Sequence, residues 1–201
     1  LNMLHTGTFT DKLDRLNNYP LIVKKNGFII SLLNYTYGTN GIHVPAPNIV
    51  NLIDTAQMRR DFARSRQARP DVTIAFMHWG TEYQSMPNKQ QQQLTEFCFE
   101  LGADLVIGAH PHVLQPMEWR KDQNRLVVYS LGNFISGQRD RYKNGGAMVY
   151  AGLQKIRYAP DSMVTTIDSA GYYLEWVYRT ADANKDYYIM PIPSFEKNNG
   201  E

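Results

Sequence analysis

Two histidines stand one residue apart in the segment Gly108-Ala109-His110-Pro111-His112. They follow the run Asp104–Ile107, whose apolar residues are typical of a buried strand. A proline pushes the residue before it toward extended geometry, so we expect His110 and His112 to point the same way. Neutral imidazole nitrogens are ligands for Zn, Fe, Mn, Ni or Co. The segment predicts a metal site at the carboxyl end of a strand, with a structural loop carrying an incidental histidine pair as the alternative.

A third histidine, His78, ends another apolar run, Val72–Met77. If the two strands are neighbours in a parallel sheet, three imidazoles converge at one edge. A histidine after a strand is also explained as a hydrogen-bonded structural residue. Glu82, four residues further on, is a candidate to hold an imidazole tautomer or to contact substrate, and the alternative is a solvated loop acid.

Asn133 follows Gly132 just after the apolar run Leu126–Val128. It is a candidate to orient substrate or a ligand loop, with an Asx turn as the alternative. A two-metal hydrolytic site also needs a bridging carboxylate and further oxygen ligands. No patterned Asp or Glu supplies them, so the residues offer half of such a site.

Alternating helix and strand signals surround these candidates. The run Leu21–Ile30 contains Asn26-Gly27 between β-prone residues and predicts a hairpin. A basic helix is expected after Asn48 as its cap, and a second helix from Asn88 to Gly102. With the two apolar strands, these helices favour a βαβ organisation. Cys98 falls on the apolar stripe of the second helix and is expected in the core.

After His112 the pattern becomes one of strands without helices. Strands are expected at residues 114–119, 126–130, 147–156, 164–167 and 172–178, as a meander or sandwich. The tail after about residue 184 is expected to be irregular. We expect a single domain over residues 1–201.

Composition excludes several classes of protein. The formal net charge is +2 with both signs interspersed, so no nucleic-acid partner is expected. No stretch reaches 18 consecutive apolar residues, so no membrane span is expected, and the first residues lack a signal-peptide pattern. The single cysteine gives no disulfide framework and no thiolate metal site.

Three segments together resemble the CapA family of bacterial capsule (poly-γ-glutamate) synthesis proteins: residues 77–83, 107–116 and 128–135. The resemblance runs from about Pro20 to Phe134. That family is similar to calcineurin-like metallophosphatases, which implies an α/β fold with a β-sandwich flanked by helices. By this resemblance His78 takes the place of the solitary metal-binding histidine, and His110 and His112 match the histidine pair.

The resemblance also carries expectations about cofactors and partners. It implies two divalent transition metals (Mn, Fe or Zn) in a full-length form, an envelope polymer such as poly-γ-glutamate, synthase subunits as partners, and an extracytoplasmic, envelope-associated location. The family's Gly-Asp, acidic and Asn-His motifs precede the region where this sequence starts. We therefore expect this sequence to be the C-terminal portion of the family domain, without its N-terminal half.

Three functions remain open at this point. The first is a metal-dependent hydrolase of phosphoesters or a γ-glutamyl polymer, with Glu82 and Asn133 behind the ligands or at the substrate. The second is a non-catalytic envelope protein that binds polymer or synthase subunits, with Tyr35–Gly41 as a contact surface. The third is a mononuclear zinc hydrolase, because three protein ligands plus water is the ligand count of catalytic zinc sites.

Overall fold

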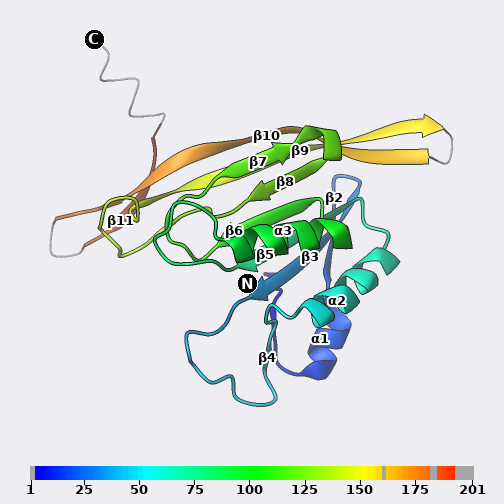
Figure 1. Cartoon of the computed structure of the whole chain (residues 1–201), viewed down its shortest axis with the longest axis horizontal. Helices are drawn as coiled ribbons and strands as arrows, with labels where there is room; N and C mark the ends of the chain where they lie inside the picture. Colours follow the sequence, from blue (N-terminus) through cyan, green and yellow to red (C-terminus); the bar gives the residue numbers. More distant parts are fainter. Residues whose placement is uncertain (1–2, 160–161, 182–184, 193–201) are drawn as a thin grey trace, which may run out of the picture.

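The computed structural model describes residues 3–159, 162–181 and 185–192, and its elements form two main layers of sheet with helices on one side (Figure 1). The helices are α1 (Lys12–Asn18), α2 (Thr55–Gln67), α3 (Lys89–Leu101) and the short 3₁₀ helix η1 (Lys121–Gln123). The strands are β1 (Thr8–Phe9), β2 (Leu21–Lys25), β3 (Phe28–Thr36), β4 (Ile49–Val50), β5 (Val72–His78), β6 (Leu105–Ala109), β7 (Met117–Arg120), β8 (Arg125–Val128), β9 (Gly145–Ala159), β10 (Ser162–Arg179) and β11 (Tyr187–Pro191).

A six-stranded sheet forms the centre of the molecule. Its order is β2-β3-β5-β6-β8-β7, with β3, β5, β6 and β8 parallel and the outer strands β2 and β7 antiparallel to their neighbours. The predicted βαβ organisation is therefore confirmed. The carboxyl ends of β3, β5 and β6 lie at one edge, where ligands bind in sheets of this kind.

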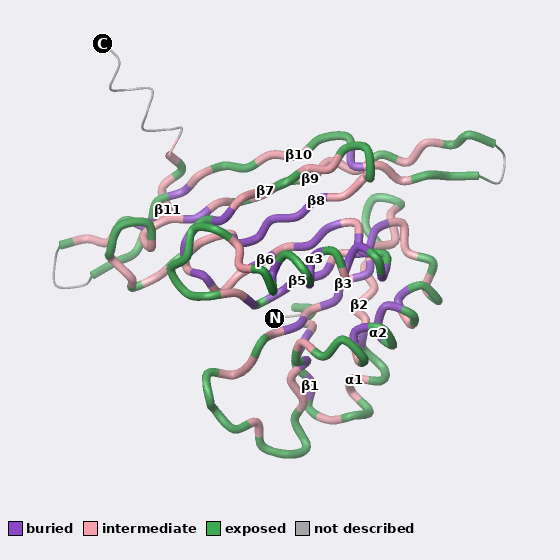
Figure 2. Tube along the Cα trace, viewed as in Figure 1, coloured by how far each residue is buried: buried purple, intermediate pink, exposed green. Residues whose placement is uncertain are grey.

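The two faces of this sheet bury different partners. Residues such as Ala75, Val106 and Val127 pack against apolar side chains of α2 and α3 in one core cluster. Their neighbours Leu105 and Leu126 pack against Ile167 of β10 in a second cluster. Side chains alternate along a strand, so one sheet serves both cores. The expected β-sandwich flanked by helices is confirmed, and Figure 2 shows buried backbone running through the central strands.

Helix α3 follows the prediction closely because its ends are encoded locally. Asn88 is its N-cap and forms a capping box with Gln91, and Gly102 ends it at φ 101°. Cys98 is fully buried in the core, as expected. The described helices are too short or too polar to cross a membrane.

The predicted basic helix, α2, begins later in the sequence than expected. Residues Ile49–Val50 form β4 paired with β1, and Asp54 rather than Asn48 caps α2. Asn48 and Asp54 are both favourable N-cap residues. The pairing of β4 with β1 decides where α2 begins, and a short-range sequence pattern does not show that pairing. The short helix α1 was not predicted. The Asn26-Gly27 hairpin is confirmed, with both residues at positive φ.

The strands after His112 do not form one meander. Strands β7 and β8 join the six-stranded sheet, while β9, β10 and β11 form a separate antiparallel sheet. The two predicted strands at 164–167 and 172–178 are parts of one long strand, β10, with an irregular register near Ile167. The expectation of an irregular tail is wrong for Tyr187–Pro191, which pairs with β10 as β11. Residues 193–201 lie outside the described residues.

Candidate metal centre

The register of the parallel strands brings His78 and the histidine pair together. Thr36 pairs with His78, and His78 pairs with Ala109, so the segment after β6 begins beside the end of β5. The ring centroids of His78 and His110 lie 4.9 Å apart. The approach of His78 and His110 at this edge of the sheet agrees with the geometry expected from neighbouring parallel strands.

Tyr37 belongs to the segment Tyr35–Gly41, which was predicted as a contact surface and not as part of the metal site, and its ring contacts both of these rings. Its centroid lies 5.9 Å from that of His78 in a stacked arrangement and 4.4 Å from that of His110. It follows β3 directly, and its backbone N–H donates to the carbonyl of His78. Its neighbour Tyr35 is fully buried, so the predicted contact surface over Tyr35–Gly41 is wrong at Tyr35.

The backbone at the histidine pair is not extended, which corrects the expectation from Pro111. His110 has φ 102° and His112 has φ 61°, both in the region that L side chains rarely adopt. The two rings still lie 6.2 Å apart. The backbone turns because β6 ends at Ala109 and the carbonyl of Pro111 accepts a hydrogen bond from the N–H of Tyr83 at 2.8 Å. Such strained residues concentrate at functional sites.

Three groups form a cluster suited to a metal ion: Glu82, His110 and His112. One ligand atom from each lies within 4.8 Å of the others, and no other such group of His, Cys, Asp or Glu occurs among the described residues. Nε2 of His112 lies 3.9 Å from Oε1 of Glu82. The structure thus brings Glu82 in among the candidate ligands, and it leaves His78 beside this group.

Asn133 fixes which nitrogen of His112 is available. Its amide nitrogen donates to the carbonyl of Lys143 at 2.8 Å and to Oε1 of Gln138 at 3.0 Å. Its Oδ1 therefore faces Nδ1 of His112, at 2.9 Å, and must accept a proton from it. Nε2, on the side of Glu82, is then left as the lone-pair nitrogen. A hydrogen bond of this kind orients metal-binding histidines.

Burial keeps two of the imidazoles neutral. Desolvation lowers the pKa of His78 below its usual value, and the neighbouring histidines His110 and His112 lower it further. Desolvation also lowers the pKa of His110; Glu82 acts in the opposite direction, and His112 adds to the lowering. Neutral imidazole is the form that binds metals, so these nitrogens are available at neutral pH.

The loop that carries Glu82 is attached to the fold by Trp79. Its indole Nε1 donates to the carbonyl of Tyr129 at 3.0 Å, across the backbone of Gly108. A Cβ at Gly108 would lie 2.0 Å from that carbonyl oxygen, which excludes any side chain. Near the start of α3, the side-chain amide nitrogen of Gln91 donates a hydrogen bond to the side-chain oxygen of Gln115 at 2.7 Å.

Two further side chains near the cluster, those of Tyr83 and Lys143, were not predicted from the sequence as part of the site. The ring of Tyr83 stacks with His112 at 6.0 Å, and Nζ of Lys143 lies 4.1 Å from the centroid of Tyr83. Tyr83 stands next to Glu82, so its position in the motif was the available signal. Lys143 lies far along the chain, in a segment without a motif, and only the folded structure brings it here.

Comparison with known proteins adds the family. The sequence model described as "Bacterial capsule synthesis protein PGA_cap" matches residues 1–138. The chain is 39% identical over 85 residues to "PGA biosynthesis protein CapA" of Bacillus subtilis (strain 168), and 37% identical over 73 residues to "Capsule biosynthesis protein CapA" of Bacillus anthracis. These alignments cover 42% and 36% of this chain but only 22% and 17% of the two relatives.

Solved structures also match this chain, at low sequence identity. NAD nucleotidase NadN of Haemophilus influenzae is 13% identical with a TM-score of 0.46, covering 96% of this chain and 39% of that chain. A phosphatase from Mycoplasma pneumoniae is 14% identical with a TM-score of 0.42, covering 89% and 60%. These likenesses assign no chemistry to the cluster. The family match extends over more than half of the sequence, and the chain belongs to the PGA_cap family of bacterial capsule synthesis proteins.

Proposed function

We propose that this chain provides a divalent-metal site to a capsule biosynthesis protein of the poly-γ-glutamate type, acting as a hydrolase of phosphoesters or of a γ-glutamyl polymer. Membership of the family and the names of its two relatives support the biosynthetic role and an extracytoplasmic, envelope-associated location. The single observation that supports the chemistry is the cluster of Glu82, His110 and His112, with ligand atoms within 4.8 Å.

The donor set fits a transition metal. Two imidazole nitrogens and one carboxylate oxygen suit Mn, Fe or Zn, and three protein ligands leave a position open for substrate or water. When bound, the metal supplies a Lewis acid that polarises a phosphoryl or carbonyl oxygen and activates water. His112 offers Nε2 because Asn133 holds its other nitrogen protonated.

His78 has a separate place in this proposal. It lies 4.9 Å from His110 between ring centroids but outside the three-residue cluster. We assign it to a second metal in the whole protein, with the carboxylate ligands that the family resemblance implies. The alternative is a site that holds one metal ion on Glu82, His110 and His112. The ligand types of the cluster support this alternative for the chain by itself, because two histidines and one glutamate form known catalytic zinc sites.

Metal titration of the purified chain tests the site. Calorimetry with Zn²⁺ and with Mn²⁺ is expected to show one tightly bound ion, lost in His110→Ala and weakened in Glu82→Gln. His43→Ala is the matched control, because His43 is exposed and outside the cluster. Failure of the wild-type chain to bind either ion, or unchanged stoichiometry in His110→Ala, would contradict the proposed site.

Hydrolysis is measured separately from binding. The metal-loaded protein is assayed with p-nitrophenyl phosphate, with bis(p-nitrophenyl) phosphate and with poly-γ-glutamate. Turnover that disappears with His110→Ala supports a hydrolase and identifies the bond. Metal binding without turnover of any of these substrates would favour the non-catalytic envelope protein that binds polymer or synthase subunits.

A further inference from the structure

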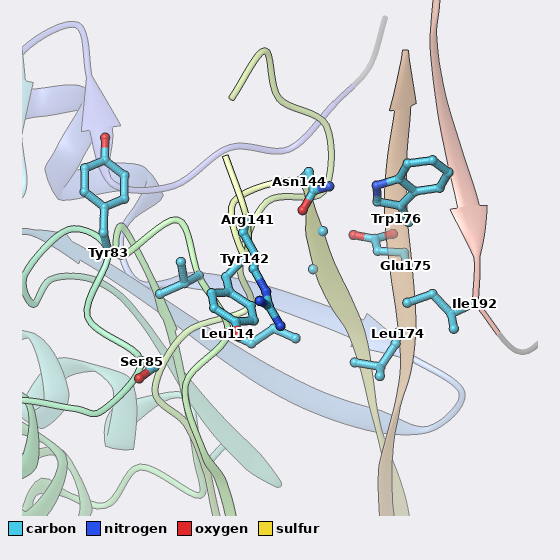
Figure 3. Close-up of a pocket in the computed structure, with 13 residues that line it drawn as sticks. Tyr83, Ser85, Leu114, Arg141, Tyr142, Asn144, Leu174, Glu175, Trp176 and Ile192 are labelled. Carbon is cyan, nitrogen blue, oxygen red and sulfur yellow. The ribbon is translucent and has the colours of Figure 1, made fainter. Parts of the chain in front are cut away.

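A cavity outside the metal cluster is lined by the loops after β5, β6 and β8 and by strands β9 and β10. Its volume is about 680 Å³. Its walls are largely apolar, with Val113, Leu114, Leu174 and Ile192 among them. Figure 3 shows that the lining side chains come from several elements, with Glu175 on β10 and Arg141 on the loop before β9.

Glu175 is an acid without a partner in this cavity. The residue is 2% exposed, and neither carboxyl oxygen has a hydrogen-bond partner in the described part of the chain. A buried carboxyl group normally has donors around it, because removing it from water without them is costly. Because Glu175 is among the residues that line the cavity, a ligand bound there can supply the missing donors.

Arg141 lines the same cavity but does not neutralise Glu175. Its guanidinium lies 4.9 Å from the ring centroid of Tyr142, and none of the ion pairs between described residues includes it. Arg141 is exposed whereas Glu175 is buried. The cavity therefore has an unpaired acid on its wall and an unpaired base nearer to solvent.

We propose that this cavity binds a small zwitterion, with an ammonium group against Glu175, an aliphatic stem along the apolar walls and a carboxylate against Arg141. An ammonium has three donors for the two carboxyl oxygens, and a guanidinium binds a carboxylate through two parallel hydrogen bonds. A bare metal ion does not fit, because hard cations need several oxygen ligands and Glu175 is the only carboxylate among the described residues that line the cavity.

The protonation of Glu175 agrees with this assignment. Burial raises its pKa to about 7, so the carboxyl group loses its proton reluctantly when the cavity lacks a cation. An ammonium next to it would favour the charged form. The cavity shares Tyr83 with the surroundings of His112, but the proposed contacts use no metal ligand.

A ladder of ω-amino acids tests the proposal. The purified chain is titrated by calorimetry, in the presence of EDTA, with β-alanine, 4-aminobutyrate, 5-aminovalerate and 6-aminohexanoate, and with pentylamine and pentanoate as one-charge analogues. One length in the ladder is expected to bind best and to bind more tightly than either analogue. Because the metal is removed, this result is independent of the proposed hydrolase.

Variants connect the binding to the two residues. Glu175→Gln and Arg141→Gln are each expected to weaken the best ligand about tenfold or more, since each loses a charged hydrogen bond. Glu100→Gln and Arg60→Gln, at exposed positions on α3 and α2, are the matched controls and should bind normally.

Three results would overturn the proposal: no binding of any ladder member at millimolar concentration, equal affinity for the one-charge analogues, or unchanged affinity in either variant. Circular dichroism verifies that each variant is folded. If Glu175→Gln does not fold, the exposed Arg141→Gln still decides the question.

Discussion

At the scale of single residues, the most informative contact is the one between Asn133 and His112. The amide orientation is fixed by its donation to the carbonyl of Lys143, so the proton on His112 is assigned to Nδ1 by the hydrogen bonds alone. Asn133 is itself 8% exposed and cannot turn toward water without losing both bonds. It therefore sets the direction in which Nε2 of His112 faces Glu82.

Replacing Asn133 tests this role. Asn133→Ala is expected to lower the affinity for Zn²⁺ or Mn²⁺ about 10- to 100-fold, because the imidazole loses the partner that orients it. Asn133→Asp keeps an oxygen acceptor for Nδ1 and should retain more affinity than the alanine variant. Calorimetric metal titration is the measurement, and Asn48→Ala, at an exposed loop position, is the control. Equal affinity in wild type and Asn133→Ala would contradict the role.

The identities of the candidate ligands were predictable from sequence, but their geometry was not. His78 and His110 follow two apolar runs, so parallel pairing of the strands was enough to predict their approach. The positive φ values of His110 and His112 were not predictable, because the restriction imposed by Pro111 favours extended backbone. The contacts of the folded loop outweigh that preference. The position of Lys143 near Tyr83 was not predictable from sequence, because it depends on the path of the long loop that carries Lys143.

At the scale of elements, the site depends on how closely three strands and their loops approach one another. Gly108 on β6 lies between the indole of Trp79, which follows β5, and the carbonyl of Tyr129, which follows β8. The hydrogen bond between those two groups crosses over β6. Only a residue without a side chain leaves room for it, so the glycine is required by packing across three neighbouring strands.

Gly108→Ala is expected to destabilise the fold by about 3 kcal/mol, in the upper range for overpacked cores, because the new Cβ would lie 2.0 Å from a backbone oxygen that cannot move freely. Urea unfolding followed by circular dichroism measures the change. Gly38→Ala is the matched control, because a Cβ at Gly38 meets nothing within 4 Å. A loss below about 0.5 kcal/mol in Gly108→Ala would show that the strands can separate to admit it.

Elements with local signals were predicted best. Helix α3 carries its capping box and its terminal glycine in its own sequence, and the hairpin carries Asn26-Gly27. The sheet to which a strand belongs is a long-range property. Strands β7 and β8 look like the strands that follow them, yet β8 pairs with β6 across the centre of the molecule. Strand β4 shows the same limit, since its pairing with β1 displaced the expected start of α2.

At the scale of the whole molecule, two sheets share one core and the two candidate sites share Tyr83. Leu105 and Leu126 of the six-stranded sheet pack against Ile167 of the antiparallel sheet. Tyr83 both stacks with His112 and lines the cavity that contains Glu175. A change that displaces Tyr83 should therefore affect both the surroundings of His112 and the cavity.

The pH dependence of stability provides a test of the buried carboxyl group in the whole fold. Burial raises the pKa of Glu175 from 4.5 to about 7, so between these values the folded chain holds a proton that the unfolded chain releases. Linkage then requires the free energy of unfolding to fall as pH rises through this window. Glu175→Gln has no proton to lose, so its stability should exceed that of wild type by a margin that grows from pH 4.5 to above 7. Urea unfolding of both proteins across this range measures the margin, with the exposed Glu100→Gln as control. A constant margin would show that Glu175 ionises normally in the folded chain, and that its carboxyl group is solvated or paired.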